Sequence, residues 1–145
     1  MVKNNKKTQL SGNTQITVEH LGSPDFKKTY NLKYPYITGS MYHGIASKEM
    51  VVKAARAGIL GFFGAGALPL STIEGTIKYI QGELNPGQSF GMNLLPTFLE
   101  DETVDLYLKY NVTIIEAAAY IQLSPALVRY RLNGLTKDAA GNIQI

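Results

Sequence analysis

Two polar side chains lie inside apolar segments that are predicted to be strands, and they are the first candidates for chemistry. Asn93 lies within the apolar segment at residues 89–95, and Glu116 lies within a later one. A buried polar group must be paired, because leaving it unpaired costs about 1–3 kcal/mol. Asn93 is therefore predicted to bond either the ring edge of a cofactor or the backbone of a neighbouring strand. For Glu116, Arg129 and Arg131 in the next predicted helix favour a structural ion pair over a catalytic carboxylate.

Two further side chains are candidates for contact with a substrate. Tyr120 follows the segment of Glu116, and its hydroxyl could orient a substrate carbonyl or simply pack at the entry of a helix. His43 lies in a predicted loop, where an ordinary exposed position is favoured over substrate contact. The only other histidine is His20, which excludes a metal site built from several imidazoles. The catalytic residues stay unknown, with His43, Glu116 and Tyr120 as candidates.

Two predicted strands are followed by glycine-bearing segments at the same end of the expected sheet. The segments are Gly39, Ser40 and Met41 after the first strand, and Gly64, Ala65 and Gly66 after the second. Small residues at the carboxyl end of a strand let a flat ligand approach the backbone, and a tight turn without a ligand is the alternative explanation. A dinucleotide-binding fingerprint is disfavoured, because Pro69 stands where its third glycine is expected.

Short apolar runs alternate with helical patterns from Tyr34 onward, which is typical of βα units that build a parallel sheet. The expected strands span residues 34–38, 59–63, 89–95 and 112–118. Serines are expected to cap three of the helices: Ser47, Ser71 in a capping box with Glu74, and Ser124. A complete (β/α)8 barrel has eight such units and takes about 250 residues. The predicted fold class is therefore α/β, as the N-terminal half, about four βα units, of a TIM barrel.

Composition and local patterns predict how the chain is divided into segments. It has 145 residues, of which 45% are hydrophobic and 17% are charged, as expected for one folded domain. We predict a polar flexible leader at residues 1–28, a partial barrel at 29–135 and a tail or truncated linker at 136–145. The absence of cysteine excludes disulfides, thiolate catalysis and cysteine-based metal sites.

The lengths of the apolar segments do not predict a membrane span, and the distribution of the charges does not predict nucleic-acid binding. The N-terminus lacks the apolar region of a signal peptide, and no run approaches the ~18 apolar residues of a membrane span, so a cytoplasmic protein is expected. The net charge is +3, but Lys3, Lys6 and Lys7 crowd into the predicted leader. No basic stripe recurs on a predicted helix, as nucleic-acid binding would require.

Four strings of sequence resemble one known family. They are GSMYHGIASKE at residues 39–49, AGILGFFGAG at 57–66, GMNLL at 91–95 and EAAAYIQLSPALVRYR at 116–131. They resemble the trans-acting enoyl reductases of trans-acyltransferase polyketide synthases and polyunsaturated fatty acid synthases. These enzymes belong to the wider nitronate monooxygenase-like superfamily. The resemblance extends from about Leu21 to Leu135.

The resemblance implies a TIM barrel that binds FMN. In the family, NAD(P)H reduces the flavin, which passes hydride to a 2-enoyl thioester on an acyl carrier protein. By position, Gly39, Ser40 and Met41 would lie along the isoalloxazine, Gly64, Ala65 and Gly66 would border it, and Asn93 would bond its ring or ribityl region. The superfamily holds the FMN phosphate in loops after the last barrel strands, and this chain does not contain those residues.

Three interpretations of the function remain open. The chain is a fragment or split subunit of such an enoyl reductase, whose partner is the acyl carrier protein of a polyketide or fatty acid synthase. Alternatively, the flavin fold performs a nitronate monooxygenase-like oxidation, or the half barrel is a non-catalytic docking and assembly module. A half barrel has two open sheet edges, which predicts pairing with a complementary barrel half or a homodimer. Enzyme activity of the chain alone is left undecided.

Overall fold

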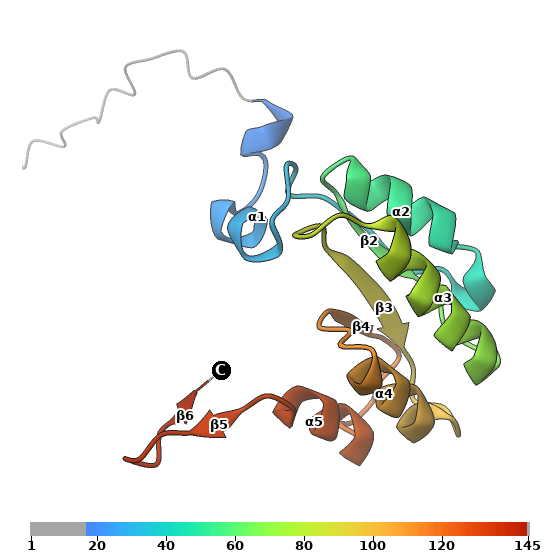
Figure 1. Ribbon diagram of the computed structural model, residues 1–145, viewed down its shortest axis with the longest axis vertical. Coiled ribbons are helices and arrows are strands. Elements are labelled where there is room, and N and C mark those ends of the chain that lie inside the picture. Colours follow the sequence, from blue (N-terminus) through green and yellow to red (C-terminus); the bar gives the residue numbers. More distant parts are fainter. Residues whose placement is uncertain (1–16, 145) are drawn as a thin grey trace, which may run out of the picture.

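A curved parallel sheet with helices on its convex side forms the body of the protein (Figure 1). The computed structural model describes residues 17–144. The elements, in chain order, are η1 (Val18–His20), α1 (Pro24–Tyr30), β1 (Ile37–Thr38), η2 (Tyr42–Gly44), α2 (Lys48–Arg56), β2 (Leu60–Phe63), α3 (Leu70–Glu83), β3 (Phe90–Leu94), α4 (Glu100–Lys109), β4 (Ile115–Ala117), α5 (Pro125–Leu132), β5 (Thr136–Lys137) and β6 (Ile143–Gln144).

The four strands of the main sheet pair in chain order, β1-β2-β3-β4, and every pair is parallel. Each connection between neighbouring strands carries a helix, as parallel pairing requires. The sheet curls into a half barrel, so that β1 and β4 form its two edges. The predicted α/β class and half TIM barrel are confirmed.

The two faces of the sheet have different neighbours. A Cβ added at Gly61 would contact Ala54 and Val51 of α2, so Gly61 faces the helices. Phe62, the next residue, therefore faces the concave side, because side chains alternate along a strand. It pairs with Gly91 of β3, whose missing side chain makes room for the Phe62 ring. The next pair along β3 and β4 on this concave side is Asn93 and Glu116.

The hydrophobic core lies between the convex face of the sheet and helices α2, α3, α4 and α5. Its fully buried members include Val51, Ile77, Ile80, Met92, Val104 and Tyr107. Tyr107 also ties α4 to β3, because its hydroxyl donates a hydrogen bond of 2.6 Å to the Asn93 carbonyl. Burial raises the pKa of this phenol, so it remains a neutral donor.

Two of the three predicted helix caps are confirmed. The Ser47 hydroxyl accepts the Met50 N–H at 3.2 Å, and the Ser124 hydroxyl accepts the Leu127 N–H at 3.0 Å. The predicted cap at Ser71 is wrong, because α3 already begins at Leu70 with Pro69 as its N-cap. Two N–H groups of the first turn donate to the Pro69 carbonyl, which leaves no role for a serine cap one residue later.

The segments that flank the half barrel have structure of their own. Residues 1–16 of the predicted leader lie outside the described residues, but α1 forms within its last part. Ser23 caps this helix and Pro24 occupies its first position, so the predicted boundary at residue 28 falls inside a helix. At the other end, β5 and β6 pair as a short antiparallel hairpin within the predicted tail. Between residues 17 and 144, no helix is long and apolar enough to cross a membrane.

Candidate functional site

The loops after β1 and β2 pack against each other at the carboxyl end of the sheet. The Gly44 N–H donates to the Gly64 carbonyl at 2.8 Å, and the Gly64 N–H donates to the Ala46 carbonyl at 3.3 Å. A Cβ at Gly64 would overlap the backbone carbonyl of Met41. Gly64 is therefore required by the approach of the β1 loop, whatever ligand binds nearby.

Gly66 and His43 extend the same contact. The His43 N–H donates to the Gly66 carbonyl at 3.1 Å, and a Cβ at Gly66 would lie 2.8 Å from the Tyr42 ring. His43 has a left-handed backbone with a φ of 59°, which tightens the turn through η2. Its ring is exposed and lies against Tyr42, with 5.9 Å between ring centroids. The imidazole thus stays available at the end of the sheet where ligands of parallel βα folds bind.

Asn93 is a buried polar residue at the carboxyl end of β3. It is 5% exposed, and its carboxamide makes no hydrogen bond among residues 17–144. The residue lines a pocket of about 500 Å³ between the loops after β2 and β3, together with Ala65, Gly66 and Phe98. A carboxamide beside a pocket can take water or a ligand as its hydrogen-bond partner, because it offers both a donor and an acceptor.

Glu116 does not form the predicted ion pair. Arg129 instead contacts Asp101 and Asp105 of α4, with N···O distances of 3.3 Å and 2.5 Å. The prediction was wrong because α5 lies beside α4 on the convex side of the sheet, whereas Glu116 faces the concave side. The Glu116 carboxylate accepts the N–H of Ser40 at 3.0 Å, so it reaches from β4 to the loop after β1.

Tyr120 is engaged in a polar cluster that the sequence did not reveal. Its hydroxyl donates to the carboxylate of Glu100 at 2.7 Å, and the Ser124 hydroxyl donates to the same oxygen. Glu100 is only 9% exposed and begins α4, where the positive end of the helix favours a carboxylate. Burial, followed by the bond to Glu100, raises the pKa of Tyr120. The cluster fixes the loop before α5, and no local pattern marks it because its members are 20 and 24 residues apart.

The residues that the sequence singled out thus fall into two groups at one end of the sheet. Asn93, Ala65 and Gly66 line one pocket, while Ser40 and Glu116 are joined across the concave side. The fit to a flat cofactor is good, since Asn93 offers hydrogen-bonding atoms that the described residues leave unused, and Gly39 has no atom within 4 Å of its added Cβ. Within residues 17–144, His, Asp and Glu side chains form no cluster of three or more that could hold a metal.

Known proteins of polyketide and fatty acid biosynthesis are similar to this chain. It is 48% identical over 141 residues to the polyketide biosynthesis protein PksE of Bacillus subtilis, covering 94% of this chain and 18% of PksE. It is 52% identical over 124 residues to the polyketide biosynthesis protein ThaF of Burkholderia thailandensis, covering 86% of this chain and 11% of ThaF. A polyunsaturated fatty acid synthase polypeptide of Thraustochytrium sp. is 40% identical over 133 residues, covering 89% of this chain and 9% of that polypeptide. No protein-family model matches the chain.

A solved structure extends the similarity to the fold. The enoyl reductase domain of MlnA, from the macrolactin biosynthesis cluster of Bacillus amyloliquefaciens, superposes with a TM-score of 0.78 and 39% identity. The alignment covers 86% of this chain and 29% of that chain. The predicted resemblance is confirmed. The chain is similar to polyketide biosynthesis proteins, to a polyunsaturated fatty acid synthase subunit and to the enoyl reductase domain of MlnA, and it spans less than a third of each of these relatives.

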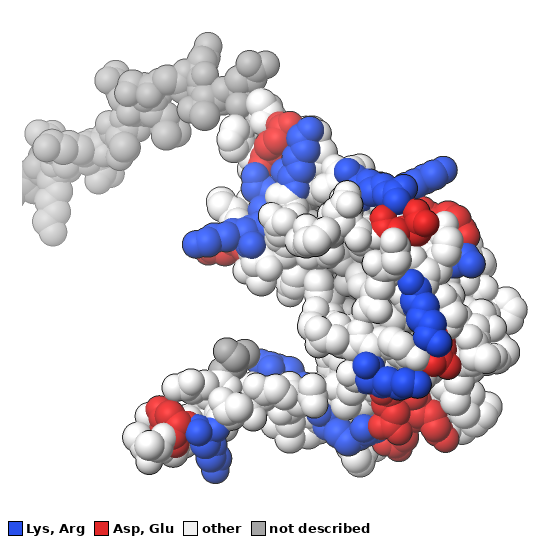
Figure 2. Space-filling view, in the orientation of Figure 1, with Lys and Arg blue, Asp and Glu red and all other residues white. Residues whose placement is uncertain are grey.

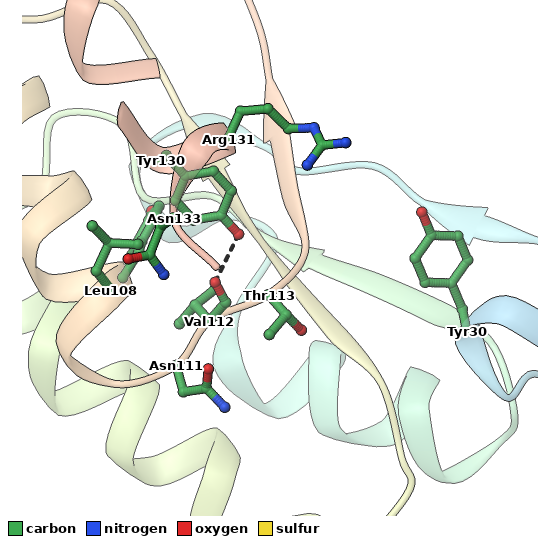
Figure 3. A pocket seen from close by; sticks show the side chains of 9 residues that line it. Tyr30, Leu108, Asn111, Val112, Thr113, Tyr130, Arg131 and Asn133 are labelled. Carbon is green, nitrogen blue, oxygen red and sulfur yellow. Dashed lines mark hydrogen bonds between the residues drawn. The ribbon is translucent and has the colours of Figure 1, made fainter. Parts of the chain in front are cut away.

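Members of this fold bind their ligands at the carboxyl ends of the strands, so a second hollow at the opposite end is not part of the candidate site. This hollow of about 410 Å³ is lined from α1, α4, the segment before β4, and α5 (Figure 3). Its Tyr130 hydroxyl donates to the Val112 carbonyl at 2.7 Å, and burial raises the Tyr130 pKa to about 12. In Figure 3, Tyr30 of α1 lies apart from the other lining residues, and the Arg131 side chain of α5 extends toward its side of the hollow.

The charged side chains lie mostly outside the concave hollow. Figure 2 shows largely uncharged side chains along this hollow and a mixed acidic and basic group on the outer helices. The mixed group includes Arg129, whose charge is shared between Asp101 and Asp105. The candidate site therefore favours an uncharged part of a ligand over a polyanion.

Proposed function

We propose that the chain is the N-terminal half of the FMN-binding barrel of an enoyl reductase, as a fragment or a split subunit. The enzyme would act in trans on 2-enoyl thioesters carried by an acyl carrier protein in polyketide or polyunsaturated fatty acid biosynthesis. The observation that carries this proposal is the position of Asn93, a 5% exposed polar residue that lines a pocket at the carboxyl end of the sheet. Similarity to an enoyl reductase domain over 86% of the chain supports it.

The residues present would hold one side of the flavin. Asn93 would donate to and accept from the ring or ribityl region, while Ala65 and Gly66 would border the ring. Gly39, Ser40 and Met41 would lie along the isoalloxazine, with Gly64 keeping Met41 in place. When bound, FMN supplies the hydride chemistry, with NAD(P)H as the source of electrons.

Proton transfer is proposed for only one of the three candidate side chains. His43 is exposed at this end of the sheet, and an imidazole both accepts and donates a proton. Tyr120 is held by Glu100, and Glu116 by the Ser40 N–H, so neither points freely at a ligand. We propose that His43 holds a proton near the substrate and that the other two support the loops.

An absorbance spectrum tests the flavin site directly. The chain is mixed with FMN, alone and with a polypeptide that supplies the second half of the barrel, and free flavin is removed by gel filtration. We expect flavin absorbance to stay with the reconstituted pair, and Asn93→Leu to reduce it at least tenfold. Glu102→Gln, an exposed change on α4, serves as the control and should retain flavin. Loss of flavin by the unmodified pair would contradict the proposal.

The open edges favour a partner for this chain. Among the described residues, β1 and β4 each lack a neighbour on one side, and the apolar Ile37, Ile121 and Leu123 are 45%, 103% and 75% exposed. Unpaired edges and exposed apolar side chains promote association. We propose a complementary barrel half as the partner, with a homodimer as the alternative. Light scattering of the chain alone distinguishes the two, because only the homodimer forms without a second polypeptide. A stable dimer without flavin would favour the docking and assembly module.

The alternative activity for the same flavin fold is a nitronate monooxygenase-like oxidation, and a substrate assay distinguishes it from the reductase. The reconstituted pair is assayed with NADPH and a 2-enoyl pantetheine thioester, and separately with a nitronate and oxygen. Consumption of the thioester and not of the nitronate is expected from the proposed reductase. The reverse result would assign the oxidase.

A further inference from the structure

Glu116 connects the two edges of the half barrel. It lies on β4, whereas its hydrogen-bond donor, Ser40, lies two residues beyond the end of β1. These strands are separated by β2 and β3 in the sheet, so the carboxylate spans the concave side. We infer that Glu116 is a positioning residue that fixes the loop formed by residues 39–44. The consequence for flavin rests on the proposed function.

The loop of residues 39–44 is held from two directions. On one side, its backbone donates to the β2 loop through His43 and Gly44. On the other side, the bond from Ser40 to Glu116 is the only side-chain hydrogen bond that reaches this loop within the described part of the chain. Removing the carboxylate would therefore release the first part of the loop and leave its second part attached.

The contact is of a strong type. A hydrogen bond from a backbone N–H to an ionised carboxylate is about twice as strong as one between neutral groups. Glu116 is partly buried, which limits competition from water. The residue before Ser40 is Gly39, which has no side chain and has open space where a Cβ would lie. The carboxylate thus supplies an anchor at the first part of the loop.

Glu116 also lies at the same level of the sheet as Asn93, whose amide is proposed to bind the flavin. Asn93 and Glu116 are register partners on neighbouring strands, and both face the concave side. Asn93 would contact the flavin from the sheet. Glu116 would hold the loop of residues 39–44 at the same height along the strands as Asn93. A shift of Ser40 would move the segment 39–41 relative to Asn93 and weaken the binding of a flat ligand between them.

Amide hydrogen exchange of the 145-residue chain, measured by NMR, tests the positioning role. We expect Glu116→Ala to speed exchange at Ser40 about tenfold, while the core amide of Met92, bonded to Ile114, stays unchanged. Glu116→Gln keeps an oxygen acceptor and should retain most of the protection. Glu102→Gln is the matched control and should leave both amides unaffected. Unchanged exchange at Ser40 in Glu116→Ala would overturn the inference, as would equal acceleration at Met92, which indicates general destabilisation.

Flavin binding provides the second readout. In the reconstituted pair, we expect Glu116→Ala to weaken FMN binding about tenfold and Glu116→Gln to weaken it less. Faster exchange at Ser40 with unchanged FMN affinity would overturn the positioning role for flavin. If the unmodified pair binds no FMN while Ser40 still responds to Glu116→Ala, the proposed function fails and the link that fixes the loop is upheld.

Discussion

Replacing Gly64 by alanine should displace the loop after β1. A Cβ at this position would overlap the Met41 carbonyl, which is backbone and cannot rotate away. The φ of Gly64 lies outside the left-handed region, so the cost is steric and not a matter of glycine's conformational freedom. The loop must move to accommodate the methyl group, which strains both backbone hydrogen bonds between Gly64 and its neighbours, Gly44 and Ala46.

The magnitude follows from these contacts. Two backbone hydrogen bonds contribute about 1 kcal/mol each, and forcing a methyl group into a packed site costs about 1–3 kcal/mol. Alanine also lowers the conformational entropy of the unfolded variant, which offsets up to about 1 kcal/mol of this loss. The net loss in the free energy of unfolding is therefore about 3 kcal/mol. With an m-value of about 2 kcal/mol/M, the urea midpoint should fall by about 1.5 M.

Urea unfolding followed by circular dichroism measures this loss. Gly75→Ala is the matched control, because Gly75 is exposed within α3 and has no atom within 4 Å of an added Cβ. Alanine favours a helix over glycine by about 1 kcal/mol, so the control should become more stable. If Gly64→Ala unfolds at the same urea concentration as the unmodified chain, the proposed overlap of the two loops is wrong.

Three further changes test single interactions. Tyr107→Phe removes the donor to a buried Asn93 carbonyl and should lower the free energy of unfolding by about 1–3 kcal/mol in urea titrations; an unchanged midpoint would show that the bond contributes nothing. Thr38→Val removes a buried hydroxyl without a partner among the described residues, so thermal unfolding should show a gain of about 1 kcal/mol, and a loss would contradict this expectation. Hydrogen bonds led by that from Tyr110 lower the pKa of Glu74 from 4.5 to about 2. A lowered folded-state pKa stabilises above the unfolded value, and this contribution disappears as the pH falls from 4.5 towards 2. Glu74→Gln should flatten the stability profile in that window, whereas identical profiles would refute the assignment.

Local patterns in the sequence were enough to predict the alternation of strands and helices and the end of the sheet at which the candidate residues lie. Apolar runs such as 59–63 form strands that are buried on both faces, and serine caps such as Ser47 and Ser124 act within one turn. The placement of Asn93 within a buried strand was equally local. The failure at Ser71 was also local, because the backbone at Pro69 starts the helix earlier than the side-chain pattern suggests.

Which polar groups meet was settled by the tertiary structure. The pairing of Glu116 with Arg129 or Arg131 was plausible in sequence, but the alternation of side chains along the strands places Glu116 on the concave side, whereas α5 packs beside α4 on the convex side. The partner of Glu116 is a backbone N–H at Ser40, 76 residues away, and a backbone group has no sequence signature. Likewise, glycine is required at position 64 because the Met41 carbonyl, which belongs to another loop, lies where a Cβ would be. Such contacts depend on how the strands curl in space, which local periodicity does not encode.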